Sequence, residues 1–325
     1  MCGFDTVFDT SVAADLTIVE EAAELVRKLE NGENTYPNGN KYPLFTSCCP
    51  GWVRFVKTQF PAYVSHLSTA KSPQQMFGAV AKSYFAQKLG VDPHDIFVVS
   101  IMPCTAKKSE AALPTMRDAC GDADVDVVLT TREIVRMFRG EQINPAVLDE
   151  TPFDSPLGSG TGAAVIFGAT GGVMEAALRT VADVLEGKDL ESIEYTAVRG
   201  LEGIKEATVQ VAGMDIKVAI AHGTANAGRL LNSIRKGERT YHFIEIMGCP
   251  GGCVTGGGQP IVNARTRYQI DPREARAKAT YECDRAMPIR KSHQNPSIHK
   301  LYGEFLEKPG SHKAHALLHT TYVER

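Results

Sequence analysis

The chain has 325 residues, and its 35 basic and 38 acidic side chains leave a formal net charge of −3. Hydrophobic residues make up 43% of it, enough to bury the core of one large domain or of two lobes. The balanced charge argues against nucleic acid or a membrane surface as the main partner. We find no membrane-length apolar run and no signal pattern, so we expect a cytoplasmic protein, or an organellar one if a targeting segment has been lost from the N-terminus.

Helices and strands alternate along the chain. Helices are predicted over residues 17–28, 72–89, 132–139, 171–185, 272–285, 296–307 and 312–320. Strands are predicted over residues 42–46, 96–102, 125–129 and 243–247, with a hairpin over 207–221 that turns near Ala212-Gly213. This alternation predicts an α/β fold with two lobes of mostly parallel sheet flanked by helices. We expect residues 1–125 to form the N-terminal lobe and residues 126–325 the C-terminal lobe.

Two of the predicted helices carry start signals. Thr17 and Glu20 fit a capping box at the start of the first helix. Ser72 fits the cap of the second helix, and Pro73 fits its first turn. We therefore expect Thr17 and Ser72 to stand at the starts of these two helices.

Five of the eight cysteines lie in three loops that follow predicted strands. The loops read TSCCPGW (46–52), MPCTAK (102–107) and CPGGC (249–253), and the last leads into GGGQP (256–260). Open α/β sheets bind ligands at the carboxyl ends of their strands. Four thiolates gathered from three loops can hold a [4Fe–4S] cluster, and the glycines allow the backbone to approach a bulky group. Adjacent Cys48 and Cys49 cannot easily both bind one metal, which leaves a spare thiol for proton chemistry.

The cysteines and histidines also allow other interpretations. Four thiolates also suit a tetrahedral zinc site, but such sites usually pair two Cys-x-x-Cys knuckles, and the sequence has none. The remaining cysteines lack a Gly/Pro-rich context and read as ordinary residues: Cys2, Cys120 and Cys283. Three histidines share one face of the last helix without a nearby acidic or cysteine partner in sequence, which favours packing and hydrogen bonding: His312, His315 and His319.

The three cysteine loops resemble the signatures of the [FeFe]-hydrogenase catalytic domain, TSCCPxW, MPCxxKxxE and ExMxCxxGCxxGGGQP. The match includes Glu110 in the second signature and Glu245 and Met247 in the third. The resemblance extends from about Gly3 to the C-terminus and includes PFDSPLGSGTGAAVIFGATGGVMEAALRT (152–180). It implies reversible 2H⁺ + 2e⁻ ⇌ H₂ chemistry at an H-cluster buried between the two lobes. It also implies ferredoxin as electron donor or acceptor, and maturation proteins that supply the cluster.

The resemblance also implies a set of cofactor ligands. The [4Fe–4S] cluster would be ligated by Cys49, Cys104, Cys249 and Cys253. Cys253 would also bridge to a [2Fe] subsite that carries CO, CN and azadithiolate ligands. Lys107 would pair with a cyanide, although a surface lysine is the alternative. The pocket around the two irons would be lined by Met102, Pro103, Pro73, Gln74, Phe167 and Met247, for whose apolar members a place in the core is the alternative.

A proton relay is the last part of the resemblance. Cys48 would exchange protons with the bridge amine, followed by Glu21, Ser68 and Glu24, with Lys28 at the exit. The sequence supports Glu21 independently, because it lies within an apolar stripe of the first helix, where a carboxylate is costly without a partner or a task. For Glu24 and Lys28 the alternative is a surface ion pair.

The start of the chain departs from the family. Related catalytic domains usually begin with a further strand and helix whose loop packs against the dithiolate, and many also carry ferredoxin-like cysteine runs. We therefore expect a fragment, a piece supplied by another chain, or a protein that manages without it. Three alternative functions remain: an iron–sulfur assembly or scaffold protein, an H₂ sensor, and an inactive truncated domain. An assembly protein would not need Cys48, Lys107 or the GGGQP loop, and a sensor would couple the site to a signalling domain.

Overall fold

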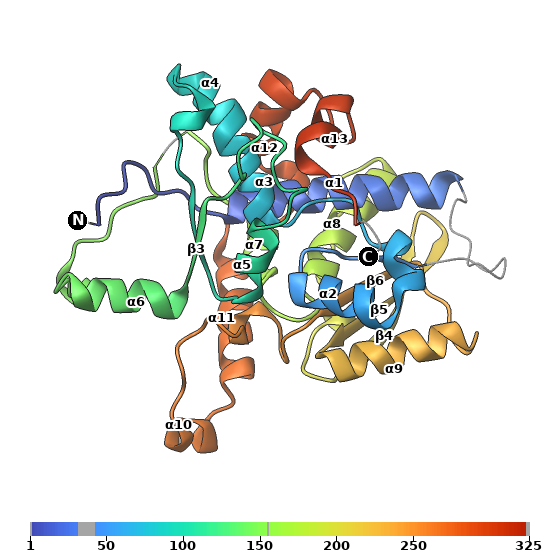
Figure 1. Cartoon of the computed structure of the whole chain (residues 1–325). Helices are drawn as coiled ribbons and strands as arrows, with labels where there is room; N and C mark the ends of the chain where they lie inside the picture. Colours follow the sequence, from blue (N-terminus) through green and yellow to red (C-terminus); the bar gives the residue numbers. More distant parts are fainter. Residues whose placement is uncertain (1, 32–42, 155, 323–325) are drawn as a thin grey trace.

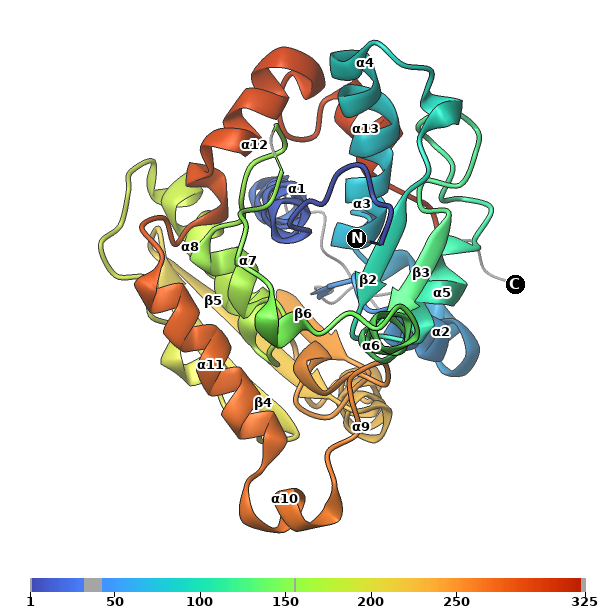
Figure 2. The same cartoon turned by 90° about the vertical axis from the view of Figure 1, so that its left-hand side faces the viewer.

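The computed structural model describes residues 2–31, 43–154 and 156–322. Helix α1 (Ser11–Asn31) runs through the middle of the molecule (Figures 1 and 2). It packs against α8 (Gly172–Glu186) on one side and against α3 (Pro73–Val80) on the other. Ile18 and Leu25 belong to the core on the α8 side, whereas Leu16 and Val19 belong to the core on the α3 side. Because it meets apolar surface on both sides, most of the helix between Val12 and Val26 is buried, whereas Arg27 and Glu30 near its end are exposed.

The larger sheet holds four strands within the described residues, in the order β1-β6-β5-β4. Strands β1 (Leu44–Phe45), β6 (Phe243–Met247) and β5 (Met214–His222) are parallel, and β4 (Ile204–Val211) pairs antiparallel with β5. Alternate residues face opposite sides. Phe243 and Met247 therefore face the α8 core, whereas Ile244 and Ile246 pack in the core with α2 (Pro50–Gln59) and α9 (Thr224–Arg235).

The smaller sheet pairs β2 (Val99–Met102) with β3 (Val127–Thr130) in parallel. Helix α5 (Ala106–Ala111) follows β2, and α6 (Thr131–Gly140) follows β3. A capping box formed by Thr130 and Glu133 begins α6 at the end of β3. In Figure 2 the two sheets stand on either side of the region around α1.

The remaining helices cover the outside of the two sheets and the ends of α1. A π-turn, η2 (Ala81–Phe85), joins α3 to α4 (Ala86–Leu89), and α7 (Gly162–Ile166) precedes α8. Another π-turn, η8 (Tyr302–Leu306), continues α12 (Pro296–Leu301). The others are α10 (Ala264–Gln269), α11 (Pro272–Ala286) and α13 (His312–Leu318), with 3₁₀ turns η1 (Pro61–His66), η3 (Pro93–Asp95), η4 (Pro145–Val147), η5 (Thr196–Val198), η6 (Cys253–Thr255) and η7 (Ser292–Gln294). No helix among the described residues is long and apolar enough to span a membrane.

The predicted α/β class is confirmed, and each predicted strand and helix has a counterpart. Strand β6 has the predicted bounds, and the hairpin turns at Ala212 and Gly213, which both have positive φ. Tyr42, placed at the start of the first predicted strand, lies outside the described residues. Both sheets take strands from each side of residue 125, because β1 pairs with β6 and β2 with β3. The division of the chain at residue 125 therefore stays a prediction.

Of the two predicted helix caps, the one at Thr17 is wrong, whereas Ser72 does stand at the N-cap position of α3, with Pro73 in the first turn. Helix α1 begins at Ser11, so Thr17 lies within it, buried, and donates its hydroxyl to the Ala13 carbonyl at 2.9 Å. The Ser72 hydroxyl donates to Glu110 Oε2 at 2.8 Å instead of bonding a helix amide. The Thr17 hydroxyl bonds within its own helix, whereas the Ser72 hydroxyl takes a partner that tertiary packing brings to it.

Candidate functional site

The cysteine loops follow the ends of β1, β2 and β6, as predicted. Cys49 stands at the N-terminus of α2, just beyond β1, and Trp52 fixes this turn by donating from its indole to the Thr46 carbonyl at 3.0 Å. Because β1 and β6 are neighbours, the Gly248 amide at the end of β6 donates to Cys49 Sγ at 3.3 Å. Strand pairing therefore brings the first and third cysteine loops together.

The four expected ligand thiols influence one another electrostatically. Burial raises the pKa of Cys253, and the nearby Cys49, Cys104 and Cys249 raise it further. Burial is also the main cause of the raised pKa of Cys49, partly offset by hydrogen bonds from Gly248 and Trp52 amides. Burial is likewise the main cause of the raised pKa of Cys249, and the nearby Cys49 raises it further. Such thiols favour ionisation only when a cationic centre compensates, as metal ligands require.

The spacing of the thiols fits a cluster better than a single ion. In a tetrahedral zinc site with Zn–S bonds of about 2.3 Å, the sulfurs lie about 3.8 Å apart. Within the described part of the chain, the one group of three or more potential ligand atoms lying within 4.8 Å of one another is His94, Cys120 and Asp122. No three of the four loop cysteines meet this limit. A wider inorganic core suits them, and a cube of iron and sulfide is such a core.

The glycines of the third loop allow protein segments to approach each other. A Cβ on Gly256 would lie 2.2 Å from the Pro103 carbonyl oxygen, and one on Gly258 would lie 2.9 Å from the Cys104 amide nitrogen. The Gly258 amide also donates to the Pro103 carbonyl at 2.8 Å. Gly252 has a φ of +100° and meets residues 168–170 in the same way. We expected these glycines to let the backbone approach the cofactor. In the structure they allow the cysteine loops to contact neighbouring segments of the protein.

Lys107 connects the second cysteine loop to the first. Its buried Nζ donates to the Cys48 carbonyl at 2.9 Å and to both carboxylate oxygens of Glu110 at 2.9 and 3.0 Å. Burial lowers the pKa of Lys107, but the Glu110 carboxylate outweighs it, so the pKa is raised overall. Glu110 also accepts from Ser72 at 2.8 Å and from Gln74 at 3.3 Å. Lys107 is thus a buried cation and not a surface lysine like Lys108.

The residues of the expected proton relay come from α1, from the 68–69 turn and from the first cysteine loop. Burial raises the pKa of Glu21 to about 8, Glu24 and Glu245 add to this, and the Ser68 hydroxyl opposes it. Glu21 Oε2 is buried without a hydrogen-bond partner. The Ser68 hydroxyl donates to Glu24 Oε2 at 2.9 Å. Burial raises the pKa of Cys48 well above its usual value, and Glu21 is the next contributor, so the thiol and the carboxyl lie near each other.

Lys28, the expected exit residue, is half-buried near the end of α1. Among the described residues Glu24 forms no ion pair with Lys28. It accepts instead from Ser68 and from the Thr69 amide at 3.2 Å. The alternative of a Glu24–Lys28 surface pair is therefore wrong, because the Glu24 side chain is buried toward the 68–69 turn.

The structure places the expected pocket residues in two groups. Phe167 and Met247 pack in the same core as Cys48 and Cys253. Gln74 is buried on α3, and its amide oxygen accepts from Ser100 at 2.9 Å. Pro73 is half-buried in the first turn of α3, and Pro103 adjoins Cys104. Met102, by contrast, packs against the small core behind the smaller sheet, with Val125 and Val128.

Two residues near the site had no role assigned from sequence. Glu245 faces the α8 side of β6, because it shares the orientation of Phe243 and Met247, and it accepts from the Gly171 and Met174 amides at 2.6 and 2.8 Å. It therefore fixes the start of α8 against the strand that carries Cys249. Burial raises the pKa of Tyr322, with Ser47, Glu110 and Cys48 among its neighbours. The ExMxC motif could have indicated Glu245, but nothing in the sequence indicates Tyr322.

Of the three histidines predicted to serve packing and hydrogen bonding, His315 and His319 do so. His319 Nδ1 lies 2.8 Å from the Thr69 hydroxyl and its Nε2 lies 3.0 Å from Glu20 Oε2. Its ring packs against His315, with centroids 4.1 Å apart. These contacts leave His319 engaged in packing and hydrogen bonds.

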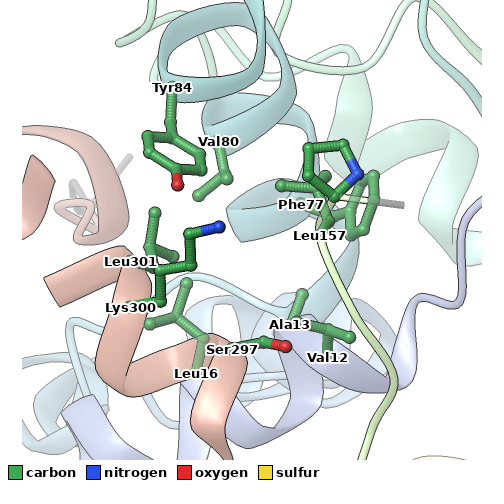
Figure 3. A pocket seen from close by; sticks show the side chains of 11 residues that line it. Val12, Ala13, Leu16, Phe77, Val80, Tyr84, Leu157, Ser297, Lys300 and Leu301 are labelled. Carbon is green, nitrogen blue, oxygen red and sulfur yellow. The ribbon is translucent and has the colours of Figure 1, made fainter. Parts of the chain in front are cut away.

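The structure also has an apolar pocket and a groove lined by arginines. Figure 3 shows an apolar pocket between α1, the α3–η2 helix and α12, and none of the expected site residues lines it. A second groove lies outside the Cys249–Cys253 loop and is lined by Pro250, Gly256, Gly257 and the arginines Arg132, Arg267, Arg273 and Arg276. This second groove puts positive charge beside the thiols.

Comparisons with known proteins agree on one family. The family model described as iron only hydrogenase large subunit, C-terminal domain, matches residues 1–257, and the iron hydrogenase small subunit model matches residues 270–325. Iron hydrogenase 1 of Clostridium pasteurianum is 47% identical over 98% of this chain and 54% of its own length. The chain therefore spans about half the length of that relative.

The chain is also similar to a solved structure and to a second kind of relative. The [FeFe]-hydrogenase HydA1 of Chlamydomonas reinhardtii is 40% identical, with a TM-score of 0.84, over 99% of this chain and 85% of the solved one. A cytosolic Fe-S cluster assembly factor, narfl of Xenopus tropicalis, is 30% identical over 98% of this chain and 66% of its own length. Sequence likeness thus extends both to proteins described as hydrogenases and to one described as an assembly factor.

Proposed function

Because the chain belongs to the iron-only hydrogenase family, we propose that it interconverts protons and molecular hydrogen at an H-cluster bound by its three cysteine loops. The observation that carries this proposal is the arrangement around Cys48. Four other cysteines lie near one another, while the neutral thiol of Cys48 lies near the buried Glu21 carboxyl on α1, one oxygen of which has no hydrogen-bond partner. Cluster binding alone does not require that fifth thiol or the carboxyl behind it.

The residues present fit the H-cluster. Cys49, Cys104, Cys249 and Cys253 would hold its [4Fe–4S] part, and Cys253 would also help to hold the [2Fe] subsite, which carries CO, CN and azadithiolate. When bound, this group supplies the iron centres at which hydrogen is made or split and a store of electrons. Amides of Gly248 and Trp52 donate toward Cys49, and such hydrogen bonds tune the potential of a thiolate-bound cluster.

The protein's own part is to position groups and to move protons. Lys107 offers a buried cation suited to an anionic ligand, held by Glu110 in a fixed position. Phe167 and Met247 exclude water from the side of Cys48 and Cys253. Cys48 and Glu21 both keep their protons at neutral pH because burial penalises their charged forms. Each can therefore donate a proton and take it back, with Ser68 and Glu24 continuing the path outward.

For electrons we propose ferredoxin as the partner, docking at the arginine-lined groove beside Cys249. Charge complementarity would steer an acidic carrier to this groove and bring it close to the thiol ligands. We expect Arg267→Glu to raise the KM for reduced ferredoxin, with less effect at high salt, and to leave turnover with methyl viologen unchanged. Lys236→Glu, an exposed substitution at the end of α9, is the control. An equal effect of both variants would contradict this docking face.

The overall proposal is tested on protein matured anaerobically with hydrogenase maturation proteins. We expect infrared bands of iron-bound CO and CN, and H₂ evolution from dithionite-reduced methyl viologen. A matured sample that shows neither would overturn the proposal.

The second candidate is an iron–sulfur assembly or scaffold function, favoured by the narfl likeness. Such a protein would bind the [4Fe–4S] cluster through the same four cysteines, without need of Cys48 or Lys107. The two functions separate in one experiment. An assembly protein would pass its cluster to an apo-acceptor protein and would show no CO or CN bands after maturation.

A further inference from the structure

We propose that His94, Cys120 and Asp122 form a binding site for a divalent cation of the zinc class, separate from the cysteine loops. One potential ligand atom from each residue lies within 4.8 Å of the other two. His94 Nδ1 and Asp122 Oδ2 are 2.8 Å apart. An imidazole nitrogen, a thiolate and a carboxylate oxygen are the ligands that zinc takes in proteins.

The backbone holds the three ligands in place from two segments. His94 belongs to η3. The main-chain amide of His94 donates to Asp92 Oδ1 at 3.0 Å, and this bond fixes the start of η3. Cys120 and Asp122 flank Gly121, whose φ of +91° turns the chain sharply between them. The Ala119 amide donates to Asp124 at 3.3 Å, and Asp124 is paired with the buried Lys71. The turn that carries two ligands is therefore anchored to the protein interior.

The surroundings suit an exchangeable cation. The side chains of His94 and Asp122 are 58% and 51% exposed, so an ion can enter and water can complete its coordination. Asp92 and Asp95 act on His94 with negative charge, whereas Lys82 and Arg117 act on Asp122 with positive charge. Binding an ion about 2.1 Å from each ligand would require the His94–Asp122 spacing to widen beyond the present 2.8 Å.

The competing reading is a surface ion pair of His94 and Asp122 beside an unrelated cysteine. Such an exposed pair contributes little to stability and does not involve the thiol. Cys120 therefore separates the two readings. A bound ion would join η3 to the turn before β3, and it would stabilise the folded chain by mass action.

The test uses protein whose iron–sulfur cluster is in place, so that the four loop cysteines are occupied. Zinc chloride is titrated calorimetrically, and the loaded sample is examined by X-ray absorption at the zinc edge. We expect one zinc ion per chain with a single sulfur ligand. Cys120→Ser and His94→Ala should each weaken binding by more than about tenfold. Cys283→Ser, an exposed cysteine on α11, is the matched control.

Two results would overturn the site. One is zinc affinity that neither Cys120→Ser nor His94→Ala alters. The other is the absence of stoichiometric binding at about 1 mM zinc, which corresponds to a binding free energy weaker than about −4 kcal/mol. Because all three side chains lie at the surface or half-buried, the variants are expected to fold, and their unchanged iron content serves as the check.

Discussion

Lys107 Nζ lies 2.9 Å from the main-chain oxygen of Cys48, so one buried cation ties the second cysteine loop to the first. The same nitrogen is held by both oxygens of Glu110. Through Ser72 and Gln74, Glu110 extends this link to the start of α3. The cation that we assign to the cofactor pocket is therefore also a structural link.

Removing this cation should destabilise the fold. Lys107→Met leaves the Glu110 carboxylate buried without its partner, and breaking a buried pair costs about 3–5 kcal/mol. The neighbouring Lys108→Met is the matched control, since the side chains of its pair with Glu133 are 43% and 39% exposed and such a pair contributes little to stability. Denaturant unfolding measures both. Equal losses in the two variants would contradict the buried role of Lys107.

The glycines of the third loop predict a contrast between neighbours. Gly256→Ala should lower the iron content per chain, because the new methyl group would meet the Pro103 carbonyl at 2.2 Å and push the second and third cysteine loops apart. Gly257→Ala should retain iron, because its methyl group would meet only the Thr105 hydroxyl at 3.3 Å, and a side chain can move. Iron analysis after anaerobic reconstitution compares them. Full iron content in Gly256→Ala would show that the loops need no close contact.

Glu21 should make stability depend on pH. Its pKa rises from 4.5 to about 8 on folding, so the folded state keeps a proton that the unfolded chain loses. The contribution is fully present below pH 4.5 and is lost as pH rises through about 8. Relative to Glu21→Gln, the free energy of unfolding of the parent protein should therefore fall by about 1.4 kcal/mol per pH unit within this window. Titration of thermal or denaturant unfolding at matched iron content checks it, and a difference that is constant across the window would refute the raised pKa.

Cys48 should matter for turnover and not for cluster binding. Burial keeps its thiol protonated at neutral pH, as a proton donor requires. Cys48→Ala should keep its iron but lose about 10²–10⁴-fold in H₂ turnover, the range that a positioned acid–base group contributes. Cys283→Ala, at an exposed position, should keep both. Turnover that survives Cys48→Ala would remove the thiol from the proton path.

What the sequence determined by itself is the local pattern. Strand-length apolar runs ending in cysteine loops placed Cys49, Cys104 and Cys249 at strand ends, because strand formation depends on short-range alternation and hydrophobicity. The helical period in α1 placed Glu21 on a buried face for the same reason. These features need no knowledge of which distant segments meet.

The tertiary structure determined which residues from distant segments come into contact. The pairing of β1 with β6 brings the Gly248 amide to Cys49. Packing brings Glu110 to the Ser72 hydroxyl, which donates to this carboxylate instead of to its own helix. The close contact of Gly256 with Pro103 and the gathering of His94 with Asp122 join residues far apart in the chain. Long-range contacts of this kind override local propensity, because a buried polar group must take whichever partner the packed interior brings to it.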